Sequence, residues 1–169
     1  DLMRVRGFFG GYYLDALAGV DIAVWDVAAK LANMPLVRLL GGRRHDRIPA
    51  YVSGLPKPTL GERVAFAQEW IGKGFDAVKF AAAVADDGEI AEMVALRSGL
   101  GSAPKIMVDL HWRYTALEAI KLIDRLNAHD LHFAEAACQP EDIDGQAQVA
   151  AAARCSIALG EEWRTAFEY

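Results

Sequence analysis

Residues 105–136, KIMVDLHWRYTALEAIKLIDRLNAHDLHFAEA, decide the fold. An apolar run, KIMVDL, comes first, and a second apolar run, LHFAEA, closes the stretch. Short apolar runs are typical of buried strands, whereas the segment between them, at 115–128, has the spacing and length of a helix. The stretch therefore predicts strand, helix and strand, the unit from which parallel sheets are built.

The same alternation extends on both sides of this stretch. Further strands are predicted at IPAYVSG (48–54), DAVKF (76–80) and CSIALGE (155–161), and further helices at 60–73, 88–99 and 142–154. Alternating strands and helices predict an α/β fold with a parallel sheet, either open and doubly wound or closed into an eight-stranded barrel. The junction SGLPKPTLGE lacks the GxGxxG of a dinucleotide-binding sheet, which disfavours nucleotide binding.

The first part of the chain has a different pattern. Apolar residues at spacings of three or four predict an amphipathic helix from about Tyr12 to Asn33, and VRLLGG (37–42) predicts a short helical turn. The apolar face of that helix is formed by Leu17, Val20, Val24, Ala28 and Leu31. Two regions are therefore expected, a helical connection at 1–47 and the α/β region at 48–169.

The composition excludes several classes of protein. The 169 residues are 53% apolar and 24% charged, which suits one well-packed core. A net charge of −5 provides no basic surface for nucleic acid or an anionic membrane. Cys138 and Cys155 form neither a disulfide framework nor a zinc motif. Because no apolar run reaches the roughly 20 residues of a membrane span, and no signal peptide is evident, we expect a cytoplasmic protein.

Three carboxylates follow apolar strands at regular intervals. Asp109, Glu135 and Glu161 are separated by 26 residues in each case. Units of similar length would place them at one height at the mouth of a barrel, where sites of this fold are assembled. Three oxygen ligands suit Mg²⁺, so these acids are the predicted metal ligands. The alternative, that such a carboxylate caps the next helix, fits Asp142 and Asp144 better.

Other polar residues near the strand ends complete the predicted site. His111 lies two residues beyond Asp109, so strand alternation points it the same way and suits a general acid or base. Lys79, near the end of AVKFAAA, needs a negative partner such as the acidic cluster or a substrate carboxylate, unless it reaches out to solvent. Loop residues that could contact substrate, with surface roles left open, are Trp112, Arg113, Trp163 and Arg164.

Taken in order, these segments resemble the mandelate racemase/muconate lactonizing enzyme branch of the enolase superfamily. AGVDIAVWDVAAKLANMPLVRLLGG (18–42) resembles the segment joining that family's capping domain to its barrel, and RIPAYVSG (47–54) resembles the first barrel strand. GFDAVKF, VDLHW, FAEA and ALGEE then match strands two to five. The resemblance implies a partial TIM-type (β/α) barrel of about five strands, with the predicted acids binding Mg²⁺.

The resemblance also implies a chemistry. In this family the ion holds a substrate carboxylate and stabilises the enediolate formed when a base removes the neighbouring α-proton. Many members carry Lys-x-Lys on the second strand, but here Ala81 replaces the second lysine. The Asp109-x-His111 arrangement resembles dehydratases of the galactonate and mannonate type, in which the histidine protonates the departing hydroxyl.

The resemblance thus implies part of an acid-sugar dehydratase, a Mg²⁺-dependent lyase of carbohydrate catabolism that converts an aldonate-type substrate to a 2-keto-3-deoxy acid. Racemisation or cycloisomerisation on the same fold, and a non-catalytic binding or scaffold role, are the alternatives. The sequence lacks an initiator Met and supplies five strands of a barrel's eight. We therefore expect a longer protein with its base on a later strand, or a partner that completes the barrel, and little activity from these residues alone. A homo-oligomer is expected as well.

Overall fold

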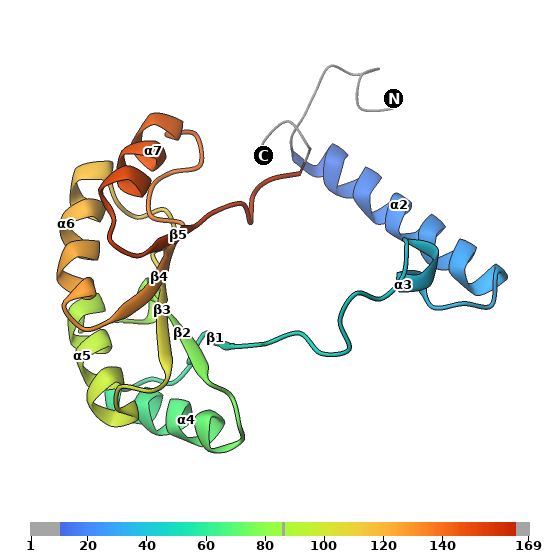
Figure 1. The fold of residues 1–169 in the computed structure, drawn as a ribbon. Coiled ribbons are helices and arrows are strands. Elements are labelled where there is room, and N and C mark those ends of the chain that lie inside the picture. Colours follow the sequence, from blue (N-terminus) through green and yellow to red (C-terminus); the bar gives the residue numbers. More distant parts are fainter. Residues whose placement is uncertain (1–10, 86, 165–169) are drawn as a thin grey trace. The chain divides into compact units, whose positions relative to one another are not determined.

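The computed structural model describes residues 11–85 and 87–164 (Figure 1). The chain divides into two compact units. The sheet unit is Pro49–Gly160, and the described part of the helical unit is 11–48 together with 161–164. The sequence had placed 161–164 with the α/β region, whereas here these residues group with the helical unit.

The sheet unit contains five strands that are all parallel. They are β1 (Val52–Ser53), β2 (Ala77–Ala81), β3 (Lys105–Asp109), β4 (Leu131–Glu135) and β5 (Ser156–Ala158). Their spatial order follows the chain, β1-β2-β3-β4-β5. A doubly wound sheet reverses its order at a switch point, whereas a barrel adds each strand beside the last. The order therefore selects the barrel from the two predicted architectures, and the structure confirms an α/β partial barrel.

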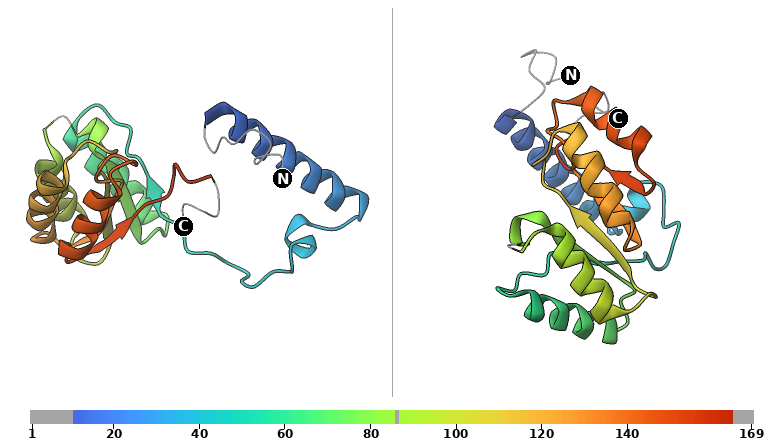
Figure 2. Two further views of the ribbon diagram at one scale, coloured as in Figure 1. Left: turned by 90° about the horizontal axis from the view of Figure 1, so that it is seen from above. Right: turned by 90° about the vertical axis from the view of Figure 1, so that its left-hand side faces the viewer.

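The helices of the sheet unit lie side by side along one face of the sheet, in chain order (Figures 1 and 2). They are α4 (Leu60–Gly72), α5 (Glu89–Leu100), α6 (Ala116–Asn127) and α7 (Ile143–Ala152), with the short helix η1 (Ala82–Val84) after β2. Helices on one face only are what a barrel wall requires, because its other face turns inward. The opposite face of the sheet is thereby left for a site.

The core lies between the strands and these helices. Val78, Phe80, Ile106 and Val108 point from β2 and β3 towards the helices and are fully buried. They pack in one cluster with Met93, Leu96, Ile123 and Leu126. Each such side chain contributes about 1.5–3 kcal/mol of transfer free energy on burial. This layer makes the strands a rigid support for the residues on the other face.

The side-chain caps of α4, α6 and α7 come from residues other than the predicted metal ligands. Thr59 and Thr115 begin α4 and α6 with reciprocal capping boxes, and the Asp142 side chain caps α7. Asp142 and Asp144 were the predicted caps; Asp142 is confirmed, whereas Asp144 lies in the first turn of α7. Asp109 and Glu135 instead lie at the last positions of their strands. Helix capping therefore does not account for these two carboxylates.

The helical unit contains α2 (Gly11–Leu31) and the short α3 (Leu36–Leu39). Both elements confirm the sequence prediction, but the predicted apolar face of α2 is largely exposed, with Val20 at 63% and Val24 at 61%. Among the described residues of this unit, α3 is the only other helix, so α2 has little to pack against. Within the part of the chain that the structure describes, no helix has the length and apolar character needed to cross a membrane.

Candidate active site at the carboxyl ends of the strands

The inner face of the sheet collects polar side chains near the ends of β2, β3 and β4. Because strand side chains alternate, the burial of Val78 and Phe80 under the helices places Lys79 on the opposite face. In the register of the sheet, Asp109 pairs with Glu135. The predicted common height therefore holds for these two carboxylates, whose strands are neighbours.

Lys79 and Glu135 form an ion pair on this face. The Lys79 Nζ donates a hydrogen bond to Glu135 Oε2, and the two side chains are only 8% and 17% exposed. The ring of Tyr51 lies 5.5 Å from Nζ. Burial disfavours the ammonium, but the hydrogen bond and the charge of Glu135 outweigh it and raise the pKa of Lys79 above its ordinary value. The structure thus supplies the negative partner that the sequence required.

His111 lies beside Asp109 at the end of β3. The His111 N–H donates to Asp109 Oδ1 at 3.0 Å, and the imidazole Nδ1 lies 3.7 Å from the same oxygen. The ring stacks on Trp112 with centroids 5.1 Å apart, and about half of the His111 side chain is exposed. An imidazole that lies beside a carboxylate and is half exposed can exchange a proton with a ligand.

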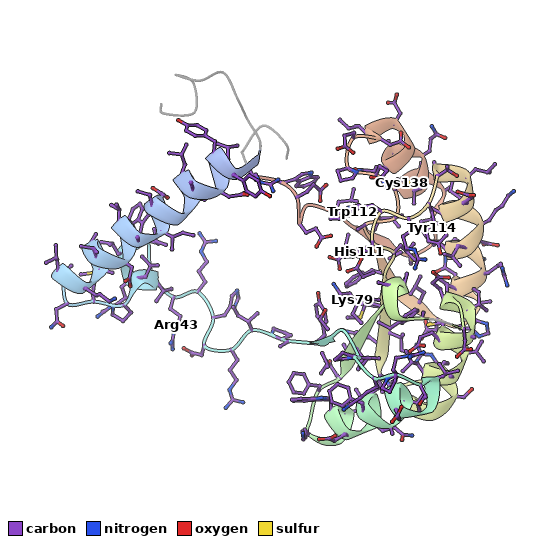
Figure 3. The ribbon with its side chains drawn as sticks, turned by 180° about the vertical axis from the view of Figure 1, so that it is seen from behind. Arg43, Lys79, His111, Trp112, Tyr114 and Cys138 are labelled. Carbon is purple, nitrogen blue, oxygen red and sulfur yellow. The ribbon has the colours of Figure 1, made fainter. Side chains whose placement is uncertain are left out.

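The position of His111 beside Asp109 does not arise from strand alternation, as the sequence analysis expected. The expectation placed His111 one step further along an extended strand, but β3 ends at Asp109. His111 and Trp112 have φ of 55° and 57°, the left-handed region that non-glycine residues rarely adopt. A turn, and not strand alternation, therefore brings the imidazole next to the carboxylate. Figure 3 labels Lys79, His111 and Trp112 in the sheet unit.

The loop after β3 is tied to the outer helices by Tyr114. Its O–H donates to Glu89 Oε1 at 2.5 Å, at the start of α5. Burial of the phenol and the nearby Glu89 carboxylate raise the pKa of Tyr114 to about 12. Arg113, on the same loop, donates from Nη1 to the Ala82 carbonyl at 2.8 Å. This nitrogen of the guanidinium is therefore already bonded to the backbone after β2. The contact of Arg113 with substrate stays a prediction.

Three predicted site residues belong to the helical unit, namely Glu161, Trp163 and Arg164. Glu161 follows Ala158, the partner of Glu135 in the sheet, by three residues. Equal sequence spacing therefore does not place it at the paired position. Arg164 Nε donates to Asp15 Oδ1 at 2.8 Å within the helical unit. The roles of these three residues stay predictions.

The donor chemistry of the sheet unit suits a magnesium ion. In the described ranges, no three His, Cys, Asp or Glu side chains are arranged closely enough to hold a metal. Two carboxylates nevertheless lie at paired positions on adjacent strands, and Lys79 offsets the charge of one of them. Hard oxygen donors such as carboxylates are what Mg²⁺ sites use. Asp109 and Glu135 fit such a site, and Glu161 is the predicted third ligand.

Tyr51 and Gln139 lie around this site and were not singled out from the sequence, whereas Trp112 was among the loop residues considered for substrate contact. Tyr51 precedes β1 by one residue and contacts Lys79 through its ring, and alternation within IPAYVSG could have placed it on the inner face. Trp112 and Gln139 contact each other across two loops, since Gln139 Nε2 donates to the Trp112 carbonyl at 2.7 Å. No local pattern predicts that contact, because the two residues lie 27 positions apart.

Comparisons with known proteins agree with this geometry. Residues 62–169 match the family described as enolase C-terminal domain-like, and residues 3–41 match the mandelate racemase/muconate lactonizing enzyme N-terminal domain. The chain is 32% identical over 157 residues to D-galactarolactone cycloisomerase from Agrobacterium fabrum, covering 90% of this chain and 42% of that protein. It is also 32% identical to L-talarate/galactarate dehydratase from Salmonella typhimurium, covering 89% of this chain and 38% of that protein.

Two solved structures extend the comparison. A member of the enolase superfamily from Agrobacterium tumefaciens has a TM-score of 0.94 and 49% identity, covering 99% of this chain and 43% of that one. A racemase from Streptomyces coelicolor A3(2) with bound magnesium has a TM-score of 0.84 and 31% identity, covering 94% of this chain and 45% of that one. The present chain therefore spans less than half the length of these proteins.

Proposed function

The chain belongs to the mandelate racemase/muconate lactonizing enzyme branch of the enolase superfamily, and from that membership we propose that the whole protein is a Mg²⁺-dependent acid-sugar dehydratase. Its substrate class is an aldonate-type sugar acid and its product a 2-keto-3-deoxy acid. The observation that carries the proposal is the His111 imidazole held beside Asp109 at the carboxyl edge of the sheet. Loss of a hydroxyl needs a proton donor, since hydroxide is a poor leaving group, whereas racemisation needs none there.

Asp109, Glu135 and Glu161 are the residues that would hold the ion. When bound, Mg²⁺ offsets the negative charge that develops on the substrate carboxylate as the α-proton leaves. Lys79 has a complementary task, because its ammonium faces the same edge of the sheet as Glu135. A charge-assisted hydrogen bond from Lys79 to a substrate carboxylate oxygen would orient the sugar acid with its α-carbon near this edge.

His111 completes the reaction as general acid. As the bond between the β-carbon and its hydroxyl breaks, the imidazolium gives its proton to that oxygen, which leaves as water. The electron pair freed at the α-carbon forms a double bond to the β-carbon, and the resulting enol converts to the 2-keto acid. Because the chain spans 42% of one curated relative, we assign the base that takes the α-proton to the protein outside this sequence.

A second function has a specific observation in its favour. The relative from Agrobacterium fabrum is named a cycloisomerase, and it is as similar in identity as the dehydratase from Salmonella typhimurium, at 32%. Cycloisomerisation or racemisation would use the same metal site and α-proton chemistry without loss of water. The cytoplasmic location and homo-oligomeric state expected from the sequence remain predictions alongside either function.

The test is made in the whole protein with Mg²⁺ and a panel of sugar acids. Formation of 2-keto acid measures dehydration, and loss of the α-proton signal in deuterated water by NMR measures proton exchange. His111→Asn is expected to lower dehydration by at least about a hundredfold, in the range for general acids, while exchange and Mg²⁺ affinity persist. His132→Asn is the matched control, because His132 is exposed at the second residue of β4, away from the carboxyl edge.

Each result decides between the functions. Exchange without loss of water across the panel would support racemisation or cycloisomerisation. Absence of both reactions would support a non-catalytic binding protein. Undiminished dehydration by His111→Asn would remove His111 from the role of general acid.

A further inference from the structure

The turn that carries His111 requires support from outside itself. Two successive non-glycine residues, His111 and Trp112, have left-handed backbone angles, with φ of 55° and 57°. In this region the side chain crowds the backbone, and most residues visit it singly. Such conformations persist where surrounding contacts determine them.

Much of that support comes from the loop after β4. Three N–H groups of the β3 loop donate to carbonyls of the β4 end and its loop: Leu110 to Glu135 at 2.9 Å, Trp112 to Ala136 at 2.6 Å and Tyr114 to Ala137 at 3.3 Å. They continue the pairing of β3 and β4 beyond the strands. The peptide between Trp112 and Arg113 is not held by these three bonds: its N–H donates within the loop to the Leu110 carbonyl at 3.3 Å, and its carbonyl needs a partner from elsewhere.

The Trp112 carbonyl is held by a side chain. Gln139 Nε2 donates to it at 2.7 Å. The backbone of Gln139 is itself fixed. Its main-chain carbonyl accepts hydrogen bonds from Gln146 Nε2 at 2.9 Å and from the Asp142 N–H at 3.0 Å, where α7 begins. The peptide after Trp112 is thus tied through Gln139 to the start of a capped helix.

We propose that Gln139 is a positioning residue for His111. By holding the Trp112 carbonyl it maintains the left-handed turn, and with it the Trp112 ring that stacks on the imidazole at 5.1 Å. The imidazole is thereby kept beside Asp109, in the orientation needed to deliver a proton to a leaving hydroxyl. This inference rests on the proposed function, because that function makes His111 the general acid.

The experiment compares three variants of the whole protein. Gln139→Met keeps the length of the side chain and removes its hydrogen-bond donor, whereas Gln139→Lys keeps a donor of similar reach. Gln68→Met is the matched control, because Gln68 Nε2 makes the same kind of bond, to the Gly99 carbonyl at 2.8 Å, between α4 and α5. The first measurement is amide hydrogen exchange at His111 and Trp112 in metal-free protein.

We expect exchange at these two amides to be about fivefold faster in Gln139→Met, the factor for one ordinary hydrogen bond. Gln139→Lys restores most of the protection, and Gln68→Met leaves both amides unchanged. With Mg²⁺ and substrate, Gln139→Met lowers the ratio of dehydration to α-proton exchange several-fold. A general loss of structure would lower both reactions together.

The outcomes separate this inference from the proposed function. Unchanged amide exchange in Gln139→Met overturns the support by Gln139, whatever the reaction is. Faster amide exchange with an unchanged ratio overturns the positioning role but leaves the dehydratase proposal intact. If His111→Asn does not impair dehydration, His111 is not the general acid of the proposed function. The positioning role of Gln139 is then overturned as well.

Discussion

Among the described residues of the sheet unit, an ion pair between two outer helices and an ion pair at the strand ends both have low exposure. Arg63 on α4 and Glu92 on α5 are each 1% exposed. Arg63 Nε donates to Glu92 Oε1 at 2.8 Å, Nη2 lies 2.8 Å from Glu92 Oε2, and Nη1 donates to the Lys57 carbonyl at 2.9 Å. This bidentate geometry satisfies much of the hydrogen-bonding capacity of both groups, as a permanently buried pair requires.

The pair of Lys79 and Glu135 is built differently. Lys79 meets one Glu135 oxygen, and the two side chains are several-fold more exposed than the pair between the helices. An ammonium on a flexible stem can change partners more readily than a guanidinium in a fork. The difference indicates that one pair holds two helices together, whereas the other can exchange its contacts for a ligand.

The largest expected effect is on the buried pair. Arg63→Leu leaves the Glu92 carboxylate uncompensated among apolar neighbours, so we expect a loss of about 3–5 kcal/mol in the free energy of unfolding. Urea unfolding followed by circular dichroism measures it. Lys79→Met is the comparison, and we expect it to cost less than half as much because Glu135 retains some access to water. Equal costs for the two variants would contradict the distinction between the pairs.

A smaller effect is expected on ion binding at the strand ends. Asp109→Asn removes one charged oxygen ligand, so we expect weaker Mg²⁺ binding. Loss of a residue that only contacts a ligand weakens metal binding by about tenfold or more, and loss of a ligand itself should exceed about tenfold. Isothermal calorimetry on the whole protein measures the affinity. Asp124→Asn is the control, because Asp124 pairs with Arg154 on the exposed surface of α6. Unaltered affinity in Asp109→Asn would count against the ligand set.

The smallest expected effect concerns the tie between the β3 loop and α5. Tyr114→Phe removes one hydrogen bond to Glu89, so we expect a loss of about 1 kcal/mol in the free energy of unfolding near neutral pH. Since the folded pKa of Tyr114 is raised from 10.0 to about 12, the stabilisation is complete below pH 10 and is lost as the pH rises through about 12. Urea unfolding at pH 8 and pH 11 should show the difference between wild type and variant narrowing; a constant difference would speak against this contact.

Local patterns in the sequence determined the elements of this protein and the positions of two of its predicted site residues. The apolar runs that predicted β2 to β4 coincide with those strands to within two residues at each end, because burial on both faces imposes a continuous apolar run. Asp109 and Glu135 were predictable for a related reason, since a carboxylate that directly follows such a run lies at the open edge of the sheet. Equal spacing failed to place Glu161 at the paired position, because the segment after β5 does not repeat the earlier register.

Tertiary structure decided the order of the strands and the contacts that orient the site. Lys79 and Glu135 are 56 residues apart in the sequence, and Gln139 and Trp112 are 27 residues apart. Local sequence periodicity therefore predicts neither contact. The left-handed turn at His111 is disfavoured by the preferences of its own residues and follows a path held by bonds from the neighbouring loop. Local propensity sets which segments become strands and helices, whereas contacts between distant segments set the conformations that propensity disfavours.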